Sequence, residues 1–114
     1  ELWFKEINKQ IKEELSKFDN IIVDEGFFTK EYFNKILRGV EDVRRFVVEI
    51  NYSLEEHVRR NRERGEKDDE PVKRMYDLWE SVPKDEKIEP NIVISDKNLT
   101  HDQIVEKIIQ ELEN

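Results

Sequence analysis

The sequence predicts an α/β fold: a three-layer structure in which a parallel sheet is covered by helices on both faces. Two observations lead to this class. Short β-branched runs alternate with amphipathic helical stretches along the 114 residues, and those stretches are long enough to connect parallel strands by right-handed crossovers. No repeat, low-complexity tract or linker divides the chain. We therefore expect a single α/β domain over residues 1–114.

The first half of the chain predicts helix, strand and helix. Apolar residues recur every three or four positions at its start, which indicates an amphipathic helix ending near Phe18: Trp3, Ile7, Ile11, Leu15 and Phe18. Residues 20–25 (NIIVDE) form a β-branched run that turns acidic before Gly26, as a buried strand does at its carboxyl end. Thr29 is then a predicted N-cap, with Phe28 and Phe33 as its hydrophobic staple, for a helix running to about residues 39–41.

The second half predicts strand, two helices, strand and helix. The predicted strands are residues 45–50 (RFVVEI) and 91–95 (NIVIS). Capping boxes begin the third and last helices, at Ser53 with Glu56 and at Thr100 with Gln103. Gly65 ends the third helix, and Pro71 opens the fourth after an acidic turn. We expect the strands at 21–24, 46–50 and 92–95 to be parallel members of one sheet.

Composition excludes several kinds of chemistry. The chain has 28 acidic and 20 basic residues, a net charge of −8, no cysteine and two histidines. Disulfides, thiolate nucleophiles, thiolate zinc sites and His-rich metal centres are therefore excluded. The acidic surface disfavours binding to a phosphate backbone. No apolar run is long enough for a membrane span, so we expect a cytoplasmic protein, and its Lys, Glu and Ile content suits a heat-adapted source.

The first candidate site is the acidic end of the run at 20–25. Ligands of α/β proteins bind at the carboxyl ends of parallel strands. There, Asp24 could hold a magnesium ion through its water or take a proton from a hydroxyl nucleophile. The alternative is that Asp24 and Glu25 are only solvated acids at the end of a strand.

The second candidate site is the basic stretch at residues 57–64 (HVRRNRER). Arg60 and Arg64 stand four residues apart, so both guanidinium groups are predicted on one helix face, where such a pair can clamp a transferring phosphoryl group. The alternative is a surface helix with three weak ion pairs four residues apart: Glu55 with Arg59, Glu56 with Arg60, and Arg59 with Glu63.

The order of elements, with the segments IIVDE, RRNRERGE and MYDLWE, resembles the second half of the small P-loop kinases related to polynucleotide kinase and the chloramphenicol phosphotransferases. Within that group it looks most like the archaeal kinase of seryl-tRNA. The resemblance covers Ile21 to Leu112. It implies ATP and Mg²⁺ as cofactors, Asp24 as the catalytic and metal-binding carboxylate, and a mobile lid over residues 59–80.

Within that lid, the resemblance assigns Arg60 and Arg64 to the ATP phosphates. It assigns Ser95 and Asp96 to the loop near the adenine. One departure is plain: the glycines at 26, 39 and 65 form no Walker A loop, which requires GxxxxGK[ST]. The family's first strand, its Walker A loop and its first helix should precede Glu1. Because the only methionine is Met75, we expect such upstream sequence. The missing strand would be the central one, between the strands at 21–24 and 46–50.

Two classes of function follow. The first is an ATP-dependent phosphotransferase acting on a hydroxyl of a small molecule or an RNA, with this chain as its acceptor-and-lid part and inactive by itself. The P-loop would come from the missing segment or a partner chain, and a copy of this chain in a homodimer could instead fill the central strand position. The second is a non-catalytic binding or assembly module that keeps the kinase-like fold.

Overall fold

The computed structural model describes residues 2–24, 29–40 and 42–114, which form five α-helices and a two-stranded parallel sheet. This confirms the α/β class, while the larger three-layer sheet stays a prediction. The chain divides into two compact units, residues 1–44 with 82–88 and residues 45–81 with 89–114. Whether the chain behaves as one domain also stays a prediction.

The first unit is built on two helices, α1 (Leu2–Leu15) and α2 (Lys30–Ile36). Their apolar faces pack together because both helices repeat apolar residues at helical spacing. The buried residues of this core are Ile11, Tyr32, Ile36 and Val40. Trp3 stacks on Tyr32 with ring centroids 5.2 Å apart.

Polar contacts fix both ends of α2. Thr29 Oγ1 accepts a hydrogen bond of 3.1 Å from the Tyr32 N–H, which confirms Thr29 as the N-cap. At the other end, the Asn8 amide donates to the carbonyls of Ile36 (2.8 Å) and Arg38 (2.9 Å). The helix is shorter than predicted: it ends at Ile36, and the chain turns over residues 37–39, where Gly39 has a φ of +82°. Phe28 of the predicted staple lies outside the described residues.

Residues 82–88 complete this unit as a short strap with one 3₁₀ turn, η1 (Lys84–Glu86). Lys87 forms an isolated antiparallel bridge with Thr29. The strap therefore pairs with the N-terminus of α2, which lies nearly sixty residues earlier in the sequence.

The strand predicted at residues 20–25 is not present over its described part, residues 20–24. Its residues run extended past α1, with Ile21 partly buried and Ile22 97% exposed. A β-strand requires a neighbouring strand for its backbone hydrogen bonds, and none lies beside this segment among the described residues. Glu25 lies outside the described residues.

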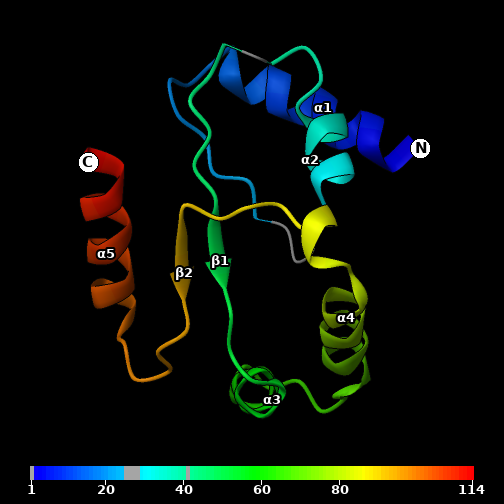
Figure 1. Cartoon of the computed structure of the whole chain (residues 1–114), viewed down its shortest axis with the longest axis vertical. Helices are drawn as coiled ribbons and strands as arrows, with labels where there is room; N and C mark the ends of the chain where they lie inside the picture. Colours follow the sequence, from blue (N-terminus) through cyan, green and yellow to red (C-terminus); the bar gives the residue numbers. More distant parts are fainter. Residues whose placement is uncertain (1, 25–28, 41) are drawn as a thin grey trace. The chain divides into compact units, whose positions relative to one another are not determined.

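The second unit contains the sheet, formed by β1 (Val48–Ile50) and β2 (Ile92–Ile94). The two strands run side by side in the same direction in Figure 1, with Val48 opposite Ile92 and Ile50 opposite Ile94. The predicted strands at 45–50 and 91–95 are thus confirmed; β1 begins three residues later than predicted, and β2 is one residue shorter at each end. Ile94 is 1% exposed and is the most buried side chain of this unit.

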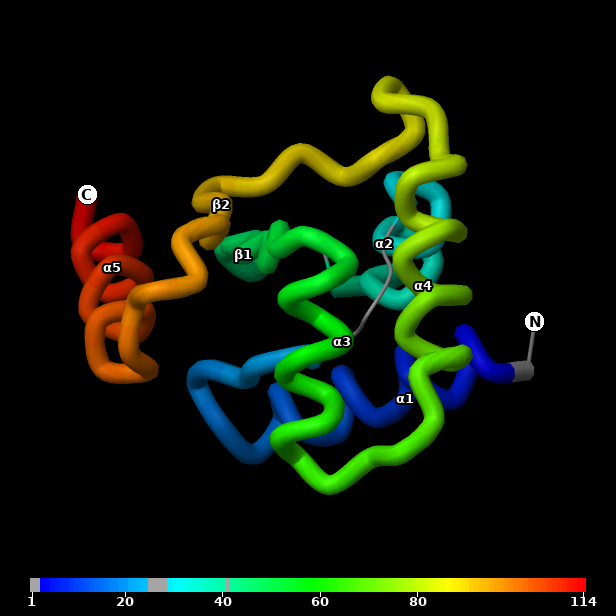
Figure 2. Tube along the Cα trace, turned by 90° about the horizontal axis from the view of Figure 1, so that it is seen from below, coloured from blue at the N-terminus to red at the C-terminus, as the bar shows by residue number. Residues whose placement is uncertain are grey.

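Three helices accompany the sheet: α3 (Leu54–Glu63), α4 (Glu70–Ser81) and α5 (His101–Glu113). The chain can be followed in Figure 2 from α3 through the acidic turn into α4. Gly65, with φ +90°, ends α3 as predicted. Thr100 and Gln103 form the complete predicted capping box of α5, which contacts β2.

Candidate functional site

The carboxyl ends of β1 and β2 lie at one edge of the sheet because the strands are parallel. Residues 51–53 leave β1 there and lead into α3, and residues 95–98 leave β2. The Asn51 N–H donates a hydrogen bond of 2.8 Å to the Ile94 carbonyl, which holds the two loop starts together. We call these two loops and the facing side of α3 the strand-end site.

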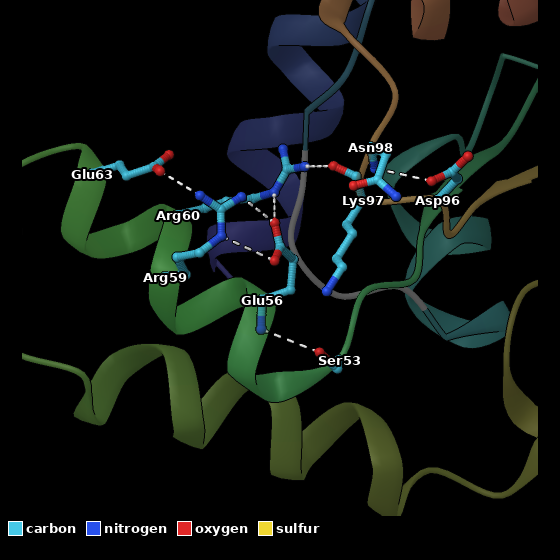
Figure 3. A network of polar contacts seen from close by, with 8 residues as sticks. All are labelled: Ser53, Glu56, Arg59, Arg60, Glu63, Asp96, Lys97 and Asn98. Carbon is cyan, nitrogen blue, oxygen red and sulfur yellow. Dashed lines mark hydrogen bonds and ion pairs between the residues drawn. The ribbon is translucent and has the colours of Figure 1, made fainter.

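Glu56 is the central residue of this site (Figure 3). It is 5% exposed, and its carboxylate accepts hydrogen bonds from two consecutive arginines. Arg59 donates through Nε at 3.1 Å and also through Nη2, and Arg60 donates through Nε at 2.9 Å. The hydrogen bonds from Arg59, together with that from Arg60, lower the pKa of Glu56 to about 2. Glu56 is therefore ionised at neutral pH despite its burial.

Arg60 connects α3 to both strand-end loops. Its guanidinium carbon lies 4.3 Å from the centroid of the Tyr52 ring. Its Nη2 donates a hydrogen bond of 3.2 Å to the Lys97 carbonyl. The loop after β2 is itself ordered by the Asp96 carboxylate, which accepts a hydrogen bond of 2.9 Å from the Asn98 N–H (Figure 3). One arginine therefore bridges the segments that follow β1 and β2.

The arginines of the basic stretch differ in how far their charge is neutralised. Arg59 pairs with Glu56 and Glu63, and Arg60 pairs with Glu56. The predicted pairs of Glu56 with Arg60 and of Arg59 with Glu63 are thereby confirmed. The predicted pair of Glu55 with Arg59 is not formed in the described structure, because Arg59 pairs with Glu56 instead. Arg62 pairs with Asp69 at 2.6 Å.

Arg64 is the exception among these arginines. It lies at the C-cap of α3, is exposed, and donates to the Asn61 side-chain oxygen at 3.3 Å. It forms no ion pair with a carboxylate in the part of the chain that the structure describes. Asn61 is itself 7% exposed and donates to the Asp68 carbonyl at 3.3 Å. Arg64 therefore has a guanidinium group that Asn61 holds through Nη2 and whose charge no acid among the described residues compensates.

The predicted site residues fall in different units. Arg60, Arg64, Ser95 and Asp96 belong to the second unit, and Asp24 belongs to the first. Arg60 contacts the loop that contains Ser95 and Asp96 through the Lys97 carbonyl, and the assignment of these three residues to a nucleotide stays a prediction. Arg64 is one helical turn further along α3 and makes none of the contacts that tie Arg60 to that loop.

Asp24 is exposed and borders an open hollow of about 420 Å³ along α1, together with apolar side chains such as Ile11 and Ile22. Among the described residues no three His, Cys, Asp or Glu side chains gather in the way that a metal ion held by protein alone would require. Magnesium in nucleotide enzymes is commonly held by one or two carboxylates, water and the substrate phosphates. A single carboxylate such as Asp24 fits that arrangement.

Sequence reasoning missed Tyr52 and the burial of Glu56. Tyr52 is 6% exposed, and its hydroxyl has no hydrogen-bond partner among the described residues. Beside it lies His57, whose pKa is lowered by burial and by the positive charge of Arg60. An aromatic residue directly before an N-cap Ser was the available signal.

A comparison with protein families identifies one match to this chain. The model of the family described as "Chromatin associated protein KTI12" matches residues 4–114. No curated protein and no solved structure matches the chain. Over the described ranges, every helix is too short or too polar to cross a membrane.

Proposed function

The chain belongs to the KTI12 family, a group of P-loop kinase-like proteins, and on that premise we propose that it is the acceptor-and-lid part of an ATP-dependent phosphotransferase. In this proposal α3 and the acidic turn that follows it close over the nucleotide. The acceptor is a hydroxyl group, which could belong to a small molecule or to an RNA.

The observation that carries the proposal is the state of Arg64. The other arginines of the basic stretch each have a carboxylate partner, which satisfies much of their charge. Arg64 has only the neutral Asn61 amide within the described residues. An exposed guanidinium that is held through one nitrogen and lacks an anion is suited to bind one, and its planar fork matches a phosphate. Arg64 is therefore assigned to the transferring phosphoryl group.

Arg60 has a different role in this proposal. Its Nε and Nη2 are engaged by Glu56 and by the Lys97 carbonyl, so fewer donors remain for a ligand. It supports the loop at residues 95–98, where Ser95 and Asp96 lie near the base of the nucleotide. The clamp predicted from two arginines thus becomes one phosphate ligand and one supporting residue.

The 114 residues contain no Walker A sequence, and in this proposal the phosphate-binding loop is supplied from outside them. Upstream sequence of the same protein or a partner chain could supply it. The extended segment at 20–24 is a suitable place for the accompanying strand, because Ile22 is 97% exposed and the segment has no strand neighbour in the described structure. ATP would bring Mg²⁺, which Asp24 would hold through water. Bound magnesium supplies charge neutralisation of the phosphates.

A non-catalytic assembly module is the second candidate function. The description of the family favours this module, because the description names an association with chromatin and names no catalytic activity. The chain's net charge of −8 argues that such an association would be made through protein partners rather than through DNA phosphates. The cytoplasmic location stays a prediction.

The experiment begins with the coding sequence upstream of Glu1, which is searched for GxxxxGK[ST] within about 80 residues, the length of the expected extra elements. Phosphotransfer is then measured in the protein that contains both parts. Arg64→Ala should lower kcat about 100-fold or more, and Asp24→Asn should be at least as damaging. Arg62→Ala is the matched control, because it removes an arginine that already has a carboxylate partner.

The outcomes separate the two candidates. If ATP binds and phosphotransfer is unchanged in both Arg64→Ala and Asp24→Asn, the assigned roles are wrong. If no upstream loop or partner restores ATP binding, the assembly module replaces the kinase.

A further inference from the structure

The side chain of Glu56 does not do what its position in the sequence predicts. Ser53 and Glu56 have the spacing of a capping box, in which the Glu carboxylate returns to the N-cap N–H. Only half of this box is formed: Ser53 Oγ accepts a hydrogen bond of 3.2 Å from the Glu56 N–H. In α5 the equivalent Thr100 and Gln103 form both halves. The carboxylate of Glu56 has therefore been diverted from capping to another partner.

That partner is the pair of guanidinium groups described above. Burying a carboxylate is costly unless it is paired and hydrogen-bonded. Here the compensation comes from Arg59 and Arg60 together. Arg59 is also held by Glu63, so it has a second acid. Arg60 has no second acid among the described residues. Glu56 is therefore the one carboxylate in the described structure that orients the Arg60 side chain.

The Arg60 side chain, oriented by Glu56, contacts the loop after β2. Held at Nε by Glu56 and stacked on Tyr52, its guanidinium reaches the Lys97 carbonyl. Lys97 lies inside the turn that the Asp96 carboxylate closes on the Asn98 N–H. A chain of contacts thus runs from the first turn of α3 to the loop at residues 95–98 (Figure 3).

From this chain of contacts we infer that Glu56 is a positioning residue. It holds Arg60 on the Lys97 carbonyl and so keeps the loop at residues 95–98 in register with α3. The consequence for nucleotide binding rests on the proposed function. Because Glu56 joins α3 to the loop at residues 95–98, it keeps Arg64 at the correct distance from the loop that lies near the base of the nucleotide.

The test compares Glu56→Gln with Glu63→Gln in the 114-residue chain. Both variants remove one carboxylate from α3, but Glu63 contacts Arg59 and not Arg60. Hydrogen exchange is measured by NMR at the Arg60 Nε–H and the Asn98 backbone N–H. In Glu56→Gln both should exchange about tenfold faster or more, because a charge-assisted hydrogen bond is lost. In Glu63→Gln both rates should stay as in the parent chain.

A third variant separates positioning from helix stability. Ser53→Ala removes the N-cap of the same helix and none of the contacts of the carboxylate. It should leave the exchange of the Arg60 Nε–H unchanged. If Glu56→Gln fails to fold, Arg60→Gln carries the test, since Arg59 remains to neutralise Glu56. Unchanged exchange at Asn98 in the folded variant overturns the inference, as does an equal acceleration in Ser53→Ala.

The second part of the test uses ATP binding to the protein with its P-loop supplied. Glu56→Gln and Arg60→Ala should each weaken ATP binding, by about tenfold, and the double variant should be no weaker than either, because the two residues act as one unit. Additive losses would contradict the inference. If ATP does not bind even to the parent protein, the proposed function fails, and the exchange rates still decide the role of Glu56.

Discussion

Replacing Ile94 by alanine should strongly destabilise the second unit and loosen the strand-end site with it. Ile94 is 1% exposed and is the last residue of β2, directly before the loop that Arg60 contacts. The substitution removes Cγ1, Cγ2 and Cδ1, and at about 0.8 kcal/mol for each buried carbon the transfer cost is about 2.4 kcal/mol. The cavity left behind adds to this, so the free energy of unfolding should fall by about 2–5 kcal/mol.

The neighbouring strand residue provides the control. Val93 points to the opposite face of the strand and is 42% exposed. Val93→Ala should therefore cost under about 1 kcal/mol, because its methyl groups are only partly removed from water. Ile94→Val, which removes one buried carbon, should cost about 0.5–1.5 kcal/mol, well below the cost of Ile94→Ala.

Urea unfolding measures these differences. In a Trp3→Phe background, Trp79 of α4 is the only tryptophan and reports on the second unit. The transition midpoint should be highest for the parent and lowest for Ile94→Ala, with Val93→Ala and Ile94→Val between them. Equal midpoints for Val93→Ala and Ile94→Ala would refute the view that Ile94 holds this unit together.

Three further predictions concern helix ends and pH. Thr100→Ala should cost about 1 kcal/mol in thermal unfolding through loss of the capping box, and an unchanged Tm would contradict the cap assignment. Gly65→Ala should cost about 1–2 kcal/mol, because its φ of +90° strains a residue with a side chain although no atom would clash; a neutral effect in urea unfolding would argue against that conformation. The low folded-state pKa of Glu56 contributes stability that is present above its ordinary pKa of 4.5 and is lost as pH falls toward about 2. Acid unfolding curves should therefore be flatter over that range in Glu56→Gln than in the parent, and identical curves would contradict the network.

The sequence predicted the helices well because each carries its own signals. Thr29, Ser53 and Thr100 are N-caps in the structure, and Gly65 ends α3. These signals are local, so neighbouring residues determine them. The match to a P-loop kinase-like family confirms the kinase-group resemblance at that level, whereas the likeness to the seryl-tRNA kinase stays a prediction.

What the sequence did not predict depends on contacts distant along the chain. The β-branched run at 20–24 has strand propensity, yet without a neighbouring strand its backbone cannot pair. The arginine that pairs with Glu56, Arg60, also donates to the Lys97 carbonyl in the loop after β2, about forty residues further along the chain. Periodicity placed Arg60 and Arg64 on one helix face but gave no information on which of them an acid would neutralise.

The strap at residues 82–88 limits how the protein can be divided into fragments. Because it completes the first unit, the chain crosses between the two units at three places, near residues 44, 81 and 88. A peptide of residues 1–44 would lack the Lys87 partner of Thr29, and a peptide of residues 45–114 would carry that partner without the helix it meets. A single proteolytic cut near residue 44 would leave the strap still attached to the second unit. Separate expression of the two units therefore requires a rejoined chain in which residues 82–88 are moved next to residues 1–44.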